Sequence, residues 1–199
     1  MKEVLISIQP QHVDKICDVI HFKNRKPIYK KTIEVRKDRP KKVKTPFKCL
    51  IYETKAKYKK GIGVYFYGIE LQGTAQGCGK VIGEFICDYI EEYEYDPQFG
   101  YYTDGYYSSQ DDLPSMCLTQ KDLINYGKGK TLFGWHISNL VIYDTPKELG
   151  EFRKPCDWNF DCCTCKRAKY ELTKAEAKVF YGCDRELTRP FQSWGYVEG

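Results

Sequence analysis

The chain of 199 residues lacks the features of a membrane-bound or exported protein. No run of 18 apolar residues occurs and the mean hydropathy is -0.58, which excludes a membrane-spanning helix. The N-terminal MKEVLISIQPQ has a short apolar stretch without a small-residue cleavage site, so a signal peptide is not expected. No Asn-x-Ser/Thr sequon is present. We therefore expect a cytoplasmic protein with no membrane partner.

Histidine is also scarce, with three in the chain, and no Ser-His-Asp or His-rich metal motif can be assembled from them. The glycine-rich GTAQGCGK (73–80) is not a phosphate-binding loop. Its glycine spacing is wrong, and Val81 stands where Ser or Thr would bind magnesium. We interpret this segment as a hairpin loop.

The charges of the two signs are concentrated in different parts of the chain. Residues 81–120 contain no Lys or Arg and nine Asp or Glu, whereas residues 21–60 contain sixteen Lys or Arg and three Asp or Glu, a net of +13. The basic block is typical of a polyanion partner, most simply nucleic acid; the alternative is a solvated lysine-rich face. Seventeen tyrosines add aromatic surface suited to stacking bases.

Hydrophobic spacing predicts an α+β fold with one mixed sheet or small barrel and two main helices. A helix begins at Pro10, with Val13 and Ile16 at helical spacing, and a second follows a Thr119/Asp122 capping box and ends at Gly127. The acidic stretch 91–112 is expected to be a surface loop. The predicted strands are 4–8, 32–36, 47–53, 63–69, 80–90 and 134–143, followed by a helical turn at 146–152 and a small helix at 173–181.

Half of the ten cysteines fall within residues 156–183. Cys162 and Cys165 form a CxxC pair, a spacing that lets two thiolates bind one tetrahedral Zn(II), and Cys156 and Cys183 would complete four ligands. Such a closed site would be structural. The alternatives are reduced thiols without metal, or a disulfide.

A family resemblance is carried by the motifs ISIQPQHVDKI (6–16), KTIEVRK (31–37), CLIYET (49–54) and GKVIGEF (79–85). They resemble the ASCH domains of the PUA-like superfamily, and segments 134–152 and 187–198 are similar to bacterial and phage-borne proteins with this domain. The resemblance implies a PUA-like small mixed β-barrel with flanking helices, which we assign to residues 1–152. The cysteine-rich residues 153–199 are expected to form a C-terminal appendage packed on it. It also implies a cleft that binds RNA or a nucleobase.

The strand period places Thr32, Glu34 and Arg36 opposite Ile33 and Val35. A carboxylate between two cations could hold a base edge while a cation takes a phosphate; the alternative is an ion pair on a half-exposed barrel rim. Glu84 is a second possible acid of the cleft; the alternative is a carboxylate on the barrel wall, paired with a lysine. The predicted nucleic-acid-binding residues are Lys31, Thr32, Glu34, Arg36, Lys37, Glu84 and Ser138.

Two residues are candidate catalytic groups. Glu34 could act as a general base or nucleophile, and His136 could titrate beside Ser138, although a buried structural histidine is the alternative. Trp135 is expected in the core and His12 on the surface. One group of relatives, amidohydrolases acting on N4-acetylcytidine, pairs a lysine with a threonine three residues on; here Lys31 is followed by Glu34, so that activity is not carried over.

The sequence thus predicts a nucleic-acid-binding protein for RNA or a modified nucleobase, with a zinc-stapled C-terminus. One alternative is a hydrolase or ribonuclease that uses the same cleft. Another is a phage or mobile-element protein that binds a host protein through its charge blocks.

Overall fold

The computed structural model describes residues 2–17, 31–66, 69–103, 112–155 and 186–198. Within these ranges the side chains are described everywhere except in 58–75. The first half of the chain contains β1 (Glu3–Ile8), α1 (Pro10–Cys17), β2 (Ile33–Arg36), β3 (Phe47–Glu53), β4 (Lys57–Phe66) and β5 (Ile69–Gln76). The second half contains β6 (Val81–Asp96), β7 (Gly100–Tyr102), α2 (Leu113–Met116), α3 (Gln120–Gly127), β8 (Leu132–Lys147), the 3-10 turn η1 (Leu149–Glu151) and β9 (Trp194–Val197).

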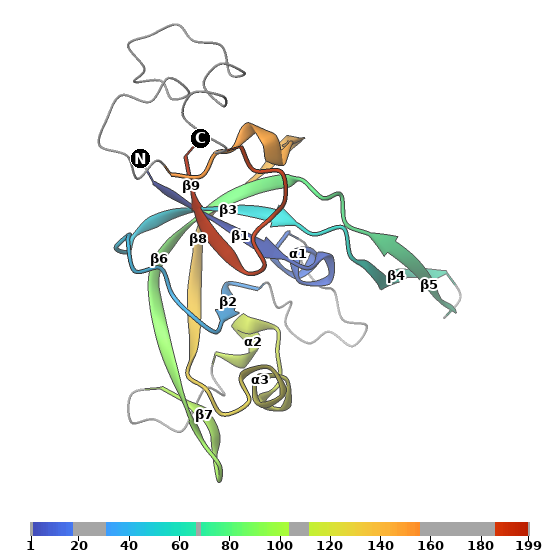
Figure 1. The fold of residues 1–199 in the computed structure, drawn as a ribbon. Coiled ribbons are helices and arrows are strands. Elements are labelled where there is room, and N and C mark those ends of the chain that lie inside the picture. The colour runs from blue at the N-terminus through green and yellow to red at the C-terminus, as the bar shows by residue number, and fades with distance from the viewer. Residues whose placement is uncertain (1, 18–30, 67–68, 104–111, 156–185, 199) are drawn as a thin grey trace, which may run out of the picture.

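One mixed sheet organises the molecule, in the order β2-β8-β6-β3-β1-β9, with β7 added to β6. Strand β1 is parallel to β3, and the other pairs of this sheet are antiparallel. The long strands β6 and β8 pair with repeated register shifts, which bend and twist them. Figure 1 shows both running the length of the body, with the β4–β5 hairpin projecting to one side.

The sheet curls so that β2, at one end of the strand order, comes close to β1 near the other end. In the described residues the hydrogen-bonded path ends at β2 and β9, so strand pairing does not close the expected barrel. Instead the Arg36 guanidinium of β2 donates a hydrogen bond to the Ser7 carbonyl of β1 over 3.0 Å. The gap between these strands is therefore bridged by a side chain, and it leaves room for a cleft.

Buried residues form apolar clusters on both sides of β2. Val13 and Ile16 of α1 pack with Trp135 in one cluster, and Trp135 is fully buried as expected. Ile33 and Val35 pack in another cluster beneath α2 and α3. Because both faces of β2 are covered, its polar side chains are buried as well.

Several sequence predictions are confirmed and two are wrong. The strand at 47–53 and the Thr119/Asp122 capping box of α3 are confirmed. The predicted strand 63–69 is wrong, since it spans the end of β4 and the start of β5. The loop predicted at 91–112 is also wrong in its first part, where β6 and β7 form a hairpin. In β6 the buried Tyr93 lies between the exposed Glu92 and Glu94, which is the alternation of a strand and not of a loop. Tyr101 of β7 is buried as well.

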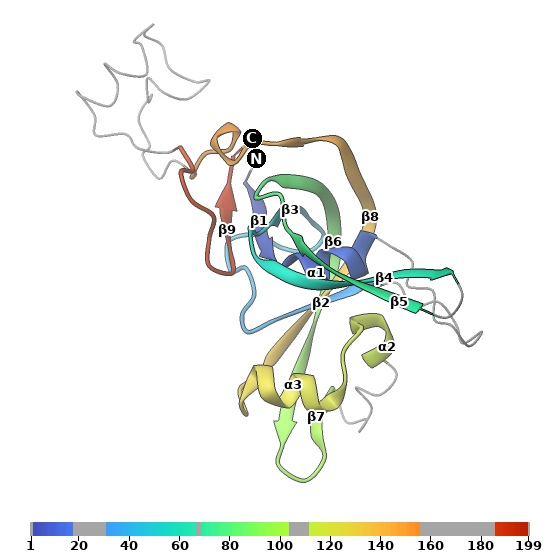
Figure 2. The same cartoon turned by 90° about the vertical axis from the view of Figure 1, so that its right-hand side faces the viewer.

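The predicted appendage (153–199) lies partly outside the described residues. Segment 156–185 is not described, and with it lie the predicted helix 173–181 and the four proposed zinc ligands. The described end returns to the body, where β9 pairs with β1 and joins the main sheet. Figure 2 shows β9 beside β1, with both termini close together. In the described part of the chain, no helix is long and apolar enough to span a membrane.

Candidate nucleic-acid-binding cleft

A cleft of about 640 Å³ lies where β1 and α1 face β2 and α3. Its walls come from segments that are distant in sequence: the end of β1, the first turns of α1, the connection from β3 to β4, one face of α3 and the residues before β9. Seen from the side in Figure 2, α1 and α3 lie at different heights along the sheet, with β2 between them. The cleft is therefore assembled by the curl of the sheet.

Three charged residues form the cleft floor. Glu34 of β2 is 5% exposed and forms ion pairs with two cations: Lys31 Nζ lies 2.6 Å from Oε2 and Arg36 Nη2 lies 2.9 Å from Oε1. Lys31 and Arg36 are themselves 2% and 8% exposed. Burial alone would raise the pKa of Glu34, but the two cations reverse this and hold its pKa below the usual value. The carboxylate is therefore ionised at neutral pH.

Helix α1 contributes a second pair. Val13 and Ile16 face the core, which turns His12 and Lys15, three residues apart, toward the cleft. His12 is half-buried rather than on the surface, so that expectation is wrong. Burial, and then the charge of Lys31, lower the pKa of His12 to about 4, and the ring is neutral at pH 7.

Helix α3 forms the opposite wall. Its capping box places Asp122 at the third position, and Tyr126 follows four residues later on the same face, so both line the cleft. Tyr126 is 38% exposed. The Lys37 ammonium, one residue beyond β2, lies 4.7 Å from the centre of the Tyr126 ring. The cleft rim thus carries the Tyr126 ring with the Lys37 ammonium over it.

Four residues that line the cleft have buried side-chain polar atoms without a hydrogen-bond partner in the described part of the chain. These atoms are His12 Nδ1, Arg36 Nε, Thr54 Oγ1 and Glu34 Oε2, and the last of these is held by the ion pair with Lys31. Buried polar atoms in proteins are nearly always hydrogen-bonded, because an unmade bond costs about 1–3 kcal/mol. The cleft therefore holds unused hydrogen-bonding capacity next to a fixed ionic floor. Its whole lining has three cations, Lys15, Lys31 and Arg36, against two carboxylates, Glu34 and Asp122.

The structure brings together only part of the predicted set. Lys31, Glu34 and Arg36 line the cleft, and Lys37 reaches its rim through Tyr126. Thr32 is exposed and lies outside the cleft lining. Its carbonyl accepts from the Ile137 amide over 2.8 Å, which continues the β2–β8 ladder.

Glu84 and Ser138 lie away from the cleft. Glu84 of β6 is bound by Lys48 over 2.7 Å and accepts a hydrogen bond from the Tyr143 hydroxyl, which is the wall-carboxylate arrangement. Ser138 donates to the Ile86 carbonyl over 3.2 Å. Both belong to the β6–β8 half of the sheet, on strands that the curl does not bring to the β1–β2 gap.

His136 also lies outside the cleft. In β8 it is opposite Ile33, whereas Trp135 is opposite Glu34, so the histidine faces the other side of the sheet. Its ring stacks on Tyr89 with centroids 3.7 Å apart, and Nε2 lies 3.5 Å from Glu91 Oε2. Burial lowers the pKa of His136 despite the carboxylate. Glu34 and His136 therefore cannot act on one bound molecule in this cleft.

Metal-binding geometry is absent from the described residues, which leave out segment 156–185. None of the five cysteines that are described is in a disulfide: Cys17, Cys49, Cys78, Cys87 and Cys117. Burial raises the pKa of Cys87 to about 12, which keeps that thiol protonated and unreactive.

Sequence reasoning missed His12, Tyr126 and Asp122 as cleft residues. The signal for His12 was its spacing of three from Lys15, on the helix flank beside Val13 and Ile16. For Tyr126 the signal was its spacing of four from the capping Asp122. Neither signal shows that the two helices meet across one cleft, which requires the sheet to curl.

The chain has similar proteins among the solved structures. The chain is similar to the crystal structure of ASCH from Zymomonas mobilis, with 16% identity and a TM-score of 0.45, over 74% of this chain and 73% of that one. This is the family that the sequence motifs resemble. No family model and no curated protein matches the chain.

Proposed function

We propose that this protein binds single-stranded RNA by taking one base into the cleft between β1–α1 and β2–α3. The proposal rests on one observation: buried, unpartnered polar atoms of His12, Arg36 and Thr54 line a cleft whose rim carries an exposed aromatic ring. A base offers the matching chemistry, with a flat face for stacking and donors and acceptors along its edge. The cleft volume of about 640 Å³ lies within the usual range for small-ligand sites.

Each wall of the cleft has a role in this proposal. Tyr126 stacks on the base, because its ring is exposed at the rim. His12, neutral at pH 7, offers Nδ1 to the base edge, and Thr54 offers its hydroxyl. Lys37 beside the Tyr126 ring is placed to neutralise a phosphate of the same nucleotide.

The ionic floor supports binding rather than hydrolysis. Both oxygens of Glu34 are held by cations and its pKa is lowered, so the carboxylate is a weak base and a poorly available nucleophile. Its role in the proposal is to hold the Lys31 and Arg36 side chains in position. The buried Arg36 Nε then keeps a fixed direction and is available to donate to the base. Steady accumulation of a cleaved or deacylated product by the purified chain would overturn this choice.

The test is the removal of the stacking ring. Tyr126→Ala should weaken binding of a labelled single-stranded RNA by about 1–3 kcal/mol, which is roughly 5- to 150-fold in Kd. The matched control is Tyr89→Ala, since Tyr89 is a more exposed tyrosine, 50% against 38%, and lies outside the cleft. Equal affinities for both variants and the natural chain would contradict the proposal.

A further inference from the structure

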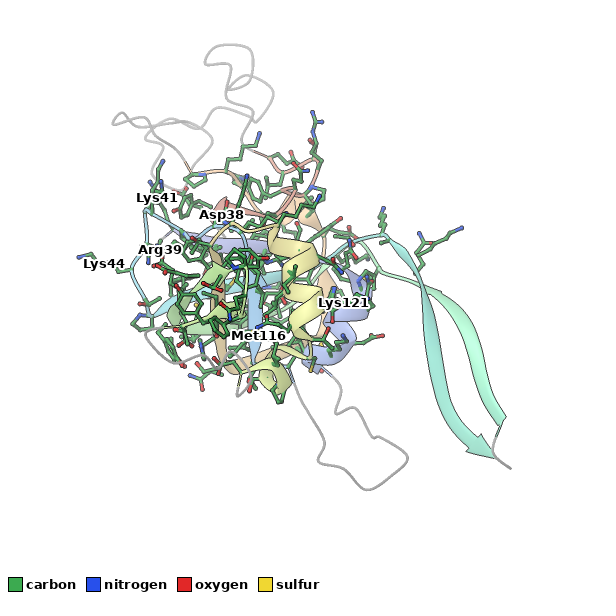
Figure 3. The ribbon with its side chains drawn as sticks, turned by 90° about the horizontal axis from the view of Figure 1, so that it is seen from below. Asp38, Arg39, Lys41, Lys44, Met116 and Lys121 are labelled. Carbon is green, nitrogen blue, oxygen red and sulfur yellow. The ribbon has the colours of Figure 1, made fainter. Side chains whose placement is uncertain are left out.

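The loop between β2 and β3 carries a cluster of exposed cations next to the cleft. Lys37, Arg39, Lys41, Lys42 and Lys44 lie in this loop, and we name residues 37–44 the basic loop. It continues directly from Arg36 of the cleft floor. Figure 3 shows Arg39, Lys41 and Lys44 gathered on the side of the body opposite the β4–β5 hairpin.

Four hydrogen bonds to aromatic side chains hold this loop, three of them at its backbone and one at the Asp38 side chain. The Tyr196 hydroxyl accepts from the amides of Lys41 and Lys42 over 2.9 and 2.7 Å. The indole of Trp135 donates to the Asp38 carbonyl over 3.3 Å, and the indole of Trp194 donates to the Asp38 carboxylate. The loop is therefore ordered by the core strands β8 and β9, unlike a freely solvated lysine-rich tail.

The cations of the basic loop are largely unneutralised. Within the described residues, Lys37, Lys41, Lys42 and Lys44 form no ion pair with a carboxylate. Arg39 lies 3.4 Å from Glu92, but both side chains are about half exposed, so this pair is weak. The one acid of the loop, Asp38, accepts a hydrogen bond from the Trp194 indole and sets one negative charge against the five cations of the loop.

Three of these cations lie over aromatic rings. Lys37 lies over Tyr126, the Arg39 guanidinium lies 5.4 Å from the centre of Phe133, and Lys42 lies 5.9 Å from that of Tyr196. Cations interleaved with aromatic rings are the surface that single-stranded nucleic acid needs, because phosphates and bases alternate along the strand. Tyr126 belongs to both the cleft and this surface, so the two are continuous.

We infer that the basic loop binds the phosphate backbone of the strand whose base occupies the cleft, so that the ligand is a polynucleotide and not a free nucleoside. This inference rests on the proposed function. It assigns the cleft to one nucleotide and the loop to the neighbouring nucleotides of the same strand. The held backbone presents the charges at fixed positions, which lowers the ordering cost of binding.

The experiment is a salt titration of the affinity for a labelled single-stranded RNA of about 12 nucleotides, within the site sizes of single-strand binders. Each phosphate contact contributes about -0.7 to the slope of log K against log salt. Lys41→Ala/Lys44→Ala should therefore reduce the steepness of this slope by about 1.4. The matched control is Lys130→Ala/Lys147→Ala, two exposed lysines outside the loop and the cleft, which should keep the natural slope.

A second variant tests the ordering of the loop. Tyr196→Phe keeps every cation but removes the hydroxyl that accepts from Lys41 and Lys42. It should weaken RNA binding without changing the salt slope, because the number of phosphate contacts is the same. An unchanged affinity would contradict the assigned role of the held backbone.

The failures of the two proposals are distinguishable. If Tyr126→Ala weakens RNA binding while Lys41→Ala/Lys44→Ala keeps the natural salt slope, the base-binding cleft is supported and phosphate binding by the basic loop is overturned. If ribonucleoside 5′-monophosphates bind as tightly as the oligonucleotide, the polymer inference is likewise overturned. If polyglutamate of the same charge competes as well as RNA, the loop is an acidic-protein surface and this inference is wrong. If no RNA binds at all, the proposed function itself fails.

Discussion

The strongest structural consequence of the cleft floor is the cost of removing its carboxylate. Glu34→Gln leaves Lys31 and Arg36 buried, with side chains only 3% and 9% exposed, and removes the anion held at 2.6 and 2.9 Å. Breaking a buried ion pair costs about 3–5 kcal/mol. The amide still accepts one hydrogen bond, which offsets about 1 kcal/mol. We therefore expect the free energy of unfolding to fall by about 2–4 kcal/mol.

The assay is urea unfolding monitored by tryptophan fluorescence. The dependence of the unfolding free energy on urea concentration should be the same in the variant and the natural chain, which shows that only stability has changed. The matched control is Glu92→Gln, which removes an acid from the half-exposed pair with Arg39 and should cost about 0–1 kcal/mol. Equal costs for the two variants would refute the reasoning that burial makes the Glu34 cluster strong. Adding Lys31→Met to Glu34→Gln should recover part of the loss, because one uncompensated cation is removed.

The same prediction has a pH dependence of known sign. The pKa of Glu34 in the folded chain lies below its usual 4.5, so its stabilising contribution is complete above that value. It is lost as the pH falls through the lower, folded pKa, where the carboxylate is protonated. The difference between the natural chain and Glu34→Gln should therefore be largest at neutral pH and shrink in acid. A difference that grows in acid would contradict this assignment.

The remaining predictions concern the cleft histidine, the α3 cap and the zinc site. The folded pKa of His12 is about 4 against 6.5 unfolded, so the unfolded chain takes up the proton first. The natural chain should lose up to about 3 kcal/mol of stability between pH 6.5 and 4, and His12→Gln should abolish that loss in a series of urea titrations. Thr119→Ala removes the cap bond to the Asp122 amide and should cost about 1 kcal/mol in the same assay, whereas no change would show that the cap is not needed. We also propose one structural Zn(II) per chain, visible by native mass spectrometry and lost in Cys165→Ser; a metal-free natural chain would contradict it.

Local patterns carried much of the fold prediction. Alternation and helical spacing are set by near neighbours, so the strand at 47–53, the start of α1 at Pro10 and the capping box of α3 could be predicted from the sequence. The pairing of Glu34 with Lys31 and Arg36 was also foreseeable, because Arg36 lies two residues further along the same face of the strand and Lys31 lies just before the strand begins. What local pattern did not show was their burial.

Burial of this cluster depends on segments far away in the chain. The alternative of a half-exposed rim is not what the structure has: the cluster is a buried floor, because β1, α1 and α3 close over β2. The same closure moves His12 from the surface into the cleft and makes Tyr126 its rim. It also leaves Glu84 and Ser138 on strands that do not reach the cleft, although short motifs had grouped them with it.

The sequence by itself determined the charge blocks, the aromatic supply, most strand and helix positions and the charged triplet of β2, since each depends on composition or on neighbours along the chain. Only the tertiary structure decided which of these residues share a cleft. The register shifts of β6 and β8 curl the sheet, and that curl brings residues 7, 12, 34, 54 and 126 to one place. It also sets the basic loop against Trp135, Trp194 and Tyr196, because long-range contacts, and not local spacing, fix the backbone there.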